Sequence, residues 1–170
     1  MSFPFFDAPP REPSQFVGYA GNTIDRRSEE RSDDSAREAL ADPATRLMLF
    51  RGGRIHLKAG ASGFDPYFAV AESAALAAKL DEAVLLGWTA AGPVVAAPAG
   101  LEPDALPEDI KAIDYRSVTT QGLLDPEASG ALAQGGALLA WHATHRFCGR
   151  CGAATEIRSG GYKRQCTGCN

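Results

Sequence analysis

All four cysteines of this 170-residue chain lie within its last 23 residues, and their spacing limits what that end can become. Cys148 and Cys151 form one C-x2-C pair, Cys166 and Cys169 form a second, and fourteen residues separate the pairs. Two such knuckles can each turn two sulfurs to one side and together complete a tetrahedral shell. The spacing therefore predicts a zinc ribbon with Zn²⁺ held by Cys148, Cys151, Cys166 and Cys169.

Redox dithiols and incidental cysteines are the alternatives to a zinc site. A redox C-x-x-C pair normally sits at a helix start in a βαβ unit that lowers one thiol pKa, and this segment has no such context. Four thiolates also leave no open coordination position, so the metal is expected to be structural and not catalytic. Gly160-Gly161 predicts a hairpin between the knuckles, with Ile157 and Tyr162 on its strands.

The three histidines offer little further metal chemistry. His142 and His145 are three apart and could share a helix face, but no third ligand accompanies them. A hydrogen bond from His145 to a ribbon carbonyl or thiolate is an equal alternative. His56 lies in a strand-like run without a partner, and we interpret it as a surface residue.

Composition and length describe one ordinary core with a small appendage. The chain is 45% hydrophobic and 22% charged, as in a soluble globular protein. Residues 1–15 contain four prolines and no signal-peptide pattern, which predicts an irregular arm. The longest apolar runs, such as "VVAAPAGL", are far too short for a membrane helix. Without an export signal we expect a cytoplasmic protein, and in that reducing compartment paired cysteines are more often metal ligands or redox centres than disulfides.

Charge is distributed unevenly along the chain. From position 146 onward five basic residues face one acid, a net of +4, and the preceding part has twelve basic and twenty acidic residues, a net of −8. Four thiolates on one Zn²⁺ would reduce the ribbon's charge to about +2. The acidic body is a poor partner for nucleic acid, and the ribbon gives only a weak signal for it. We interpret the mixed charges of residues 26–38 as a solvated helix and loop.

Hydrophobic patterns predict a mixture of strands and helices in the body. Strands are expected at residues 47–50 and 55–57 around a Gly-Gly turn, at 67–70, up to Trp88, and near 94–95 after a turn at 92–93. A short strand and a Gly-Asn turn are expected at residues 16–22, and an Ala-rich helix at about 72–80. A long helix starts at the N-cap Asp125, and Gly135-Gly136 weakens it unless close packing requires glycine there. The fold class is α+β, with a body of residues 16–145 and a ribbon of residues 146–170.

The segment around the first knuckle resembles the NADH pyrophosphatases, the NAD-cleaving branch of the Nudix hydrolases. The residues that fill the family's pattern are Trp141, His142, His145, Phe147, Cys148, Gly149, Cys151 and Gly152. Upstream, a family signature is matched by Gly21, Asn22, Ile24, Asp25 and Arg26. The resemblance covers about residues 16–170.

The resemblance implies an N-terminal Nudix-like domain and a small zinc ribbon that precede a catalytic Nudix domain. Such enzymes hydrolyse NADH or NAD⁺ to a nicotinamide mononucleotide and AMP with Mg²⁺ or Mn²⁺, some remove NAD caps from RNA, and they tend to form homodimers. The glutamate-rich catalytic box G-x5-E-x7-R-E-U-x-E-E-x-G-U, in which U is a bulky aliphatic residue, does not occur in this sequence. No catalytic or cofactor-binding residue is assigned. We expect a partial gene product that is inactive alone, and a ribbon that lacks its closing strand after Cys169.

A second hypothesis belongs to another class of function. The ribbon would act as a stand-alone binding module for RNA or a protein partner. Its basic residues would supply the contacts: Arg146, Arg150, Arg158, Lys163 and Arg164.

Overall fold

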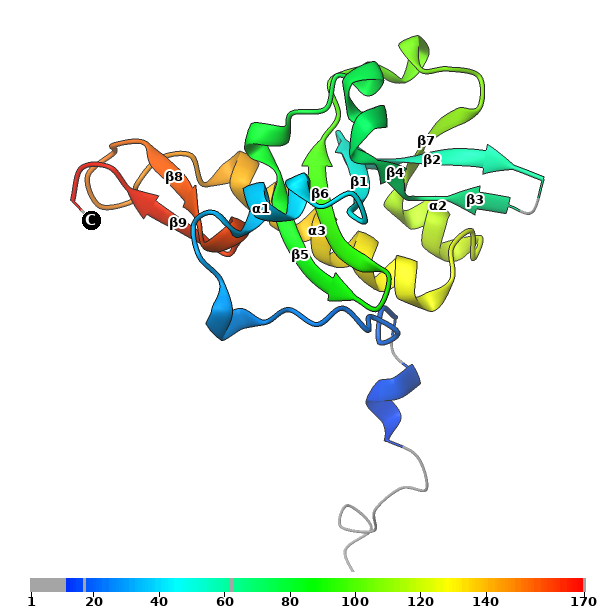
Figure 1. Ribbon diagram of the computed structural model, residues 1–170, viewed down its shortest axis with the longest axis horizontal. Helices are drawn as coiled ribbons and strands as arrows, with labels where there is room; N and C mark the ends of the chain where they lie inside the picture. Colours follow the sequence, from blue (N-terminus) through cyan, green and yellow to red (C-terminus); the bar gives the residue numbers. More distant parts are fainter. Residues whose placement is uncertain (1–11, 17, 62, 170) are drawn as a thin grey trace, which may run out of the picture.

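The computed structural model describes residues 12–16, 18–61 and 63–169, and Figure 1 shows a mixed sheet with helices on both faces and a small hairpin at the C-terminal end. The sheet has the order β3-β2-β1-β6-β5, with β4 paired to β1 and β7 paired to β2. β1 and β6 run parallel, and every other pair is antiparallel. The predicted α+β class is confirmed.

The strands of the sheet are short. They are β1 (Arg46–Arg51), β2 (Arg54–Gly60), β3 (Gly63–Asp65), β4 (Phe68–Ala69), β5 (Val84–Thr89), β6 (Gly92–Pro98) and β7 (Ile110–Asp114). The ribbon consists of β8 (Thr155–Arg158) and β9 (Lys163–Cys166). The α-helices are α1 (Ser35–Ala41), α2 (Tyr115–Thr120) and α3 (Pro126–Thr144). The 3-10 helices are η1 (Pro13–Phe16), η2 (Ser28–Glu30), η3 (Val70–Leu76), η4 (Leu80–Glu82), η5 (Pro103–Ala105) and η6 (Ser159–Gly161). None of the described helices is long and apolar enough to cross a membrane.

The β1–β2 hairpin forms where the sequence predicts it. Gly52 and Gly53 have φ angles of 54° and 77°, and a two-residue turn with both φ values positive suits the twist of a hairpin. Residues without glycine's freedom would be strained there.

The long helix α3 also forms as predicted, with the Asp125 side chain accepting from the Ala128 amide at 2.7 Å. The two central glycines are sites of close packing. A Cβ on Gly135 would lie 3.0 Å from both Ala96 and Phe50, and one on Gly136 would lie 3.1 Å from Tyr115. Gly135 therefore lets α3 lie close against the sheet, and Gly136 lets it lie close against Tyr115 of α2.

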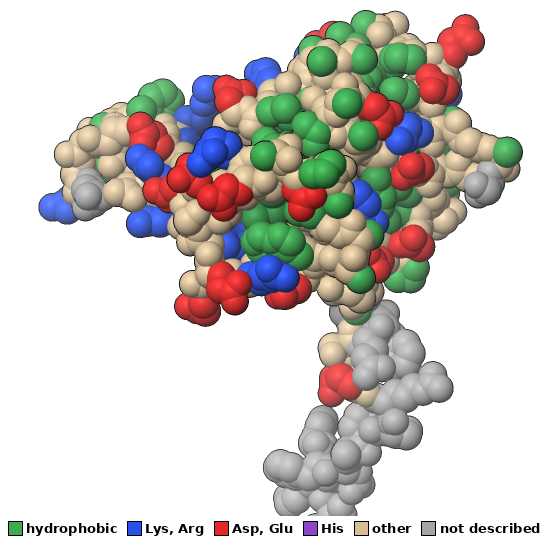
Figure 2. Space-filling model, viewed as in Figure 1, with side chains coloured by type: hydrophobic (Ala, Val, Ile, Leu, Met, Phe, Trp, Pro, Cys, Tyr) green, Lys and Arg blue, Asp and Glu red, His purple; other side chains and the backbone are tan. Residues whose placement is uncertain are grey.

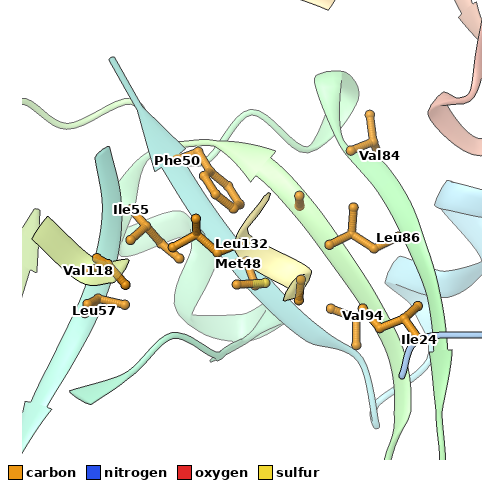
Figure 3. Close-up of a cluster of buried hydrophobic side chains, with 12 residues drawn as sticks. Ile24, Met48, Phe50, Ile55, Leu57, Val84, Leu86, Val94, Val118 and Leu132 are labelled. Carbon is orange, nitrogen blue, oxygen red and sulfur yellow. The ribbon is translucent and has the colours of Figure 1, made fainter. Parts of the chain in front are cut away.

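Alternating residues of the strands build one core on each face of the sheet. Figure 3 shows the cluster beneath α3, where Met48 and Phe50 of β1 meet Leu132. Leu47 and Leu49, which point the other way, pack with Phe68 and Leu76 in a second cluster. Both faces of β1 are consequently buried, which explains its continuous apolar sequence.

Three predicted elements of the body differ from the structure in type or extent. The helix expected at residues 72–80 is instead η3, and Ala77 ends it in a left-handed conformation with φ 50°. The strand expected at 67–70 is only the two-residue β4, because Val70 already starts η3. The turn expected at 92–93 lies at 90–91, and Gly92 and Pro93 belong to β6.

The N-terminal predictions are only partly testable, since residues 1–11 and 17 lie outside the described part. Within the described residues, Pro13–Phe16 forms a 3-10 turn, so the end of the predicted irregular arm is ordered as a helix turn. No strand forms among the described residues of 16–19, where Gly18 begins a turn that reaches Gly21.

Candidate metal centre and its attachment to the body

The structure brings the four cysteine sulfurs together at the tip of the ribbon. All four Sγ atoms lie within 4.8 Å of one another. The Sγ–Sγ distances are 3.7 Å for Cys148–Cys169, 3.4 Å for Cys151–Cys166 and 3.7 Å for Cys166–Cys169. A tetrahedral zinc with bonds of about 2.3 Å requires sulfurs about 3.8 Å apart. The donor set and its spacing therefore fit Zn²⁺.

Backbone amides of the second knuckle point at its first sulfur. The amides of Gly168 and Cys169 donate to Cys166 Sγ at 3.2 and 3.3 Å. A Cβ on Gly168 would lie 2.9 Å from Ala153, so the second knuckle packs closely against the residues after the first one at a glycine. Such amides orient a sulfur and stabilise its negative charge.

The same amides shift the thiol equilibria. They lower the pKa of Cys166 to about 6, and the amides of Cys151 and Arg150 lower the pKa of Cys148. The neighbouring sulfurs raise the pKa of Cys169 to about 12. Cys166 therefore loses its proton readily, whereas Cys169 keeps its proton up to high pH. A bound dication would neutralise the thiolates and so favour the loss of all four protons.

The ribbon hairpin forms as predicted, with one residue displaced. β8 and β9 pair antiparallel from Thr155 with Cys166 to Arg158 with Lys163. The predicted strand residue Ile157 lies in β8, but Tyr162 lies in the connection before β9 and contacts the body. The connection needs positive φ at Ser159 (52°) and at the two glycines that follow it.

His142 attaches this connection to α3. Its Nε2 lies 2.8 Å from the Gly161 carbonyl, and Arg164 Nη1 donates to Nδ1 at 3.0 Å. An imidazole that accepts at Nδ1 carries its proton on Nε2, and burial lowers its pKa. Neither nitrogen of His142 is left for a metal, and His145 instead bonds within its own helix, to the Trp141 carbonyl at 3.0 Å.

Arg31 is the centre of the contact between ribbon and body. Its guanidinium donates to the carbonyls of Arg26 (2.7 Å), Leu85 (2.6 Å) and Leu86 (3.0 Å) and lies 4.1 Å from the ring centroid of Tyr162. β5 is an edge strand, and its pairing with β6 shifts register between Leu85 and Gly87, next to these two carbonyls. The interpretation of this charged stretch as solvated surface is therefore wrong at Arg31.

Two further side chains complete the contact at the bulge. Gln134 of α3 donates to the Leu86 carbonyl at 2.9 Å, and the Tyr162 hydroxyl donates to the same carbonyl at 3.2 Å. Gln134 also contacts the Tyr162 hydroxyl. One carbonyl of the bulge thus joins α3, β5 and the ribbon.

Asp33 adds a charged contact at the rim. Its carboxylate accepts from the Ser159 amide at 2.9 Å and from Arg158 at 3.1 Å. The Ser159 amide, followed by the Arg158 charge, lowers the pKa of this carboxyl. A Cβ on Gly161 would lie 2.5 Å from Val84, so the ribbon backbone lies directly on β5.

The N-terminal signature residues hold the chain in place beside this contact. Asn22 donates from its amide to Gln134 Oε1 at 2.7 Å and accepts from the Ile24 amide at 3.1 Å. Asp25 exchanges two backbone hydrogen bonds of 2.9 Å with Trp88, and Arg26 offers its carbonyl to Arg31. The structure therefore brings the signature and the ribbon, far apart in sequence, to one site.

The prediction for His56 is wrong, and one group of contact residues was missed. His56, predicted at the surface, is fully buried in β2, and neither ring nitrogen has a partner among the described residues. Desolvation lowers its pKa. Arg31, Gln134 and Tyr162 were not predicted to act together, because no local pattern marks contacts that depend on a bulge in β5.

The basic residues of the ribbon do not form one patch. Arg158 is paired with Asp33 and Glu156. Arg164 bonds to Thr155 and His142. Lys163 lies on the opposite face of β9 from Arg164, because side chains alternate along a strand. This dispersion does not favour a stand-alone module that uses all five cations.

Comparison with known proteins supports the same architecture. A model of the NADH pyrophosphatase-like rudimentary NUDIX domain matches residues 44–141, and one of the NADH pyrophosphatase zinc ribbon domain matches residues 143–170. The NAD-capped RNA hydrolase NUDT12 of Homo sapiens is 49% identical over 43 residues, which are 25% of this chain and 9% of that protein. The proteins of the same name from Macaca fascicularis and Pongo abelii are each 46% identical over 43 residues, again 9% of their length. The chain belongs to the family of NADH pyrophosphatase-like rudimentary Nudix domains, joined here to the zinc ribbon of the same enzymes.

Proposed function

We propose that this chain is the non-catalytic N-terminal portion of an enzyme that hydrolyses the diphosphate of NADH or NAD⁺ to a nicotinamide mononucleotide and AMP. NAD-capped RNA would be a second substrate. The observation that carries the proposal is the match of body and ribbon, together, to the two domain families of NADH pyrophosphatases.

In this proposal Cys148, Cys151, Cys166 and Cys169 hold one structural Zn²⁺. The four sulfurs at tetrahedral spacing support that role. Zinc would fix the knuckles, and the contacts at Arg31, His142 and Asp33 would fix the ribbon to the body. The two parts would then act as one rigid support for a catalytic Nudix domain. The body would end at residue 145 and the ribbon would begin at residue 146, the boundary expected from the sequence.

Divalent ions for catalysis would belong to that catalytic domain. The sequence contains no glutamate-rich Nudix box. Among the described residues the cysteine quartet is the cluster of His, Cys, Asp or Glu side chains suited to a metal. Mg²⁺ or Mn²⁺ would therefore act through glutamates of the catalytic domain. A homodimer and a cytoplasmic location complete the proposal, and the free thiols agree with a reducing compartment.

A direct assay tests the proposal. The 170-residue chain, zinc-loaded and incubated with NADH and Mg²⁺ or Mn²⁺, should release no AMP, as measured by chromatography. Robust turnover would contradict the non-catalytic assignment. In a gene product that carries this chain together with a Nudix box, Cys166→Ser should reduce NADH hydrolysis, whereas Thr167→Ser next to it should not. Equal activity of both variants would sink the supporting role of the zinc site.

A further inference from the structure

Phe147 is an exposed aromatic side chain held in a fixed place. Its side chain is 72% exposed, and Tyr19 is the other exposed large hydrophobic residue in the described part of the chain. The backbone of Phe147 forms a bridge with Ala154, and the next residue is Cys148 of the metal site. The ring is therefore presented to solvent by the rigid first knuckle.

A recess of about 440 Å³ lies beside this ring. It is lined by Arg146, Phe147, Ala154, Thr155 and Arg164. None of these residues carries a carboxylate. A volume of a few hundred cubic ångströms is the size of sites that take small organic groups.

Two guanidinium groups border the recess. Arg164 is held by Thr155 Oγ1 and the Thr155 carbonyl, each at 2.7 Å, and by His142 Nδ1 at 3.0 Å. These bonds use three of its five N–H donors and leave two for a ligand. Arg146 forms no ion pair with any described residue. Burial, followed by the charge of Arg146, lowers the pKa of Arg164, which indicates that the two cations lie near each other.

The surroundings limit the direction in which an anionic chain can leave. A second hollow, between ribbon and body, is lined by Arg146 and Arg164 together with three acids: Asp81, Glu82 and Glu156. On the face drawn in Figure 2, Lys and Arg side chains occur both at the ribbon end and over the body, whereas most Asp and Glu side chains lie over the body. An anionic chain is consequently repelled on the side of the second hollow and leaves more easily over the ribbon.

We propose that this recess binds one nucleotide of a single-stranded RNA, with the base stacked on Phe147 and the phosphate on Arg146 and Arg164. Every base has a π-face that stacks on an aromatic side chain, and guanidinium groups bind phosphate in a bidentate manner. An acidic peptide would use the two arginines but gain nothing comparable from the ring. The site deepens the proposed function, on which it rests, because NAD-capped RNA continues as a single strand beyond its cap.

Fluorescence anisotropy with the zinc-loaded 170-residue chain tests the site. The probe is a labelled single-stranded RNA of about ten nucleotides at low salt. Phe147→Ala should weaken binding roughly tenfold, since stacking on one aromatic side chain typically contributes that much. Phe147→Trp should keep the affinity, and the new tryptophan should be quenched by the stacked base. Arg146→Gln should weaken binding and reduce the salt slope by about one, while Arg37→Gln on the body should change nothing.

Several results would overturn the proposal. They are the absence of RNA binding, equal affinity of Phe147→Ala and the parent chain, and equal competition by a polyglutamate peptide. Zinc content of each variant reports whether the ribbon is folded. If Phe147→Ala loses zinc, two other measurements test the site. They are the tryptophan quenching in Phe147→Trp and the salt dependence of RNA binding by Arg146→Gln, and an unchanged value of both would overturn the proposal. The anisotropy experiment measures binding and not hydrolysis. A negative result would therefore overturn the RNA site without changing the outcome of the NADH assay, and a contrary result in the NADH assay would not change the measured RNA affinity.

Discussion

The body and the ribbon keep their shapes by different means. The body buries two clusters of aliphatic and aromatic side chains, one on each face of its sheet. In the described part of the ribbon, residues 146–169, only Gly160 and Gly161 are buried. The ribbon therefore has no hydrophobic core, and its fold depends on the metal site and on contacts with the body. The fold of the body is expected to depend on its hydrophobic clusters and not on the metal site or the ribbon.

Metal removal should give the largest contrast between the two parts. A chelator that extracts zinc should abolish hydrogen-exchange protection in residues 146–169, because structural zinc supplies most of the folding free energy of such modules. Amides of β1, β5 and β6 should stay protected. Mass-spectrometric hydrogen exchange measures both, and loss of protection throughout the chain would contradict the separation.

A core substitution should act on the body. Leu132→Ala removes a fully buried side chain from the cluster beneath α3 and should lower the free energy of unfolding by about 3 kcal/mol. Urea denaturation followed by circular dichroism measures the change. Lys111→Ala, at an exposed position of β7, is the matched control. A loss below 1 kcal/mol for Leu132→Ala would mean that this cluster is not the body's main support.

The attachment between the parts should break at Arg31. Arg31→Gln removes the Arg31 donors to the Leu85 and Leu86 carbonyls and should weaken docking by about 2 kcal/mol, because the Leu85 carbonyl then loses its side-chain donor and Leu86 keeps only Gln134 and Tyr162. Exchange in β8 and β9 should rise while zinc stays bound. Arg37, which pairs with Asp34 at the surface of α1, provides the control Arg37→Gln. Equal exchange in the two variants would show that Arg31 does not hold the ribbon.

The smallest effect concerns His56, which is buried without a hydrogen-bond partner in the described part of the chain. Because its pKa is lowered in the folded chain, the unfolded chain binds more protons, and stability falls as the pH drops below about 6.5. His56→Leu removes the unpaired ring and should raise stability by about 1 kcal/mol at pH 7. It should also flatten this acid slope, to which His142 contributes in the same direction. Thermal unfolding between pH 5 and 8 measures both, and a steeper slope in the variant would contradict this account of His56.

Local patterns in the sequence were enough for elements that local chemistry determines. The Gly52-Gly53 hairpin, the capped helix α3 and the cysteine quartet all follow from residues that are neighbours in the chain. The predictions failed where distant contacts decide. The Ala-rich segment forms the 3-10 helix η3, although alanine itself favours an α-helix. Ala77 ends this helix in a left-handed conformation.

The contact between ribbon and body could not have been predicted from local patterns. It requires a bulge in β5 next to the Leu86 carbonyl, and Arg31, Gln134 and Tyr162 reach that carbonyl from three separate segments of the chain. From the sequence alone, polar residues of this kind are predicted to lie at the solvent-exposed surface. His56 is the opposite case, since its polar ring is covered by neighbouring elements that the pattern of β2 alone does not reveal.

The shape of the ribbon depends, in this proposal, on four cysteines that jointly hold one zinc. Native mass spectrometry of the chain, purified under reducing conditions, measures the bound metal. We expect one zinc per chain and no zinc in Cys166→Ser. A chain that carries no metal and has two disulfide bonds or four free thiols in its place would contradict it.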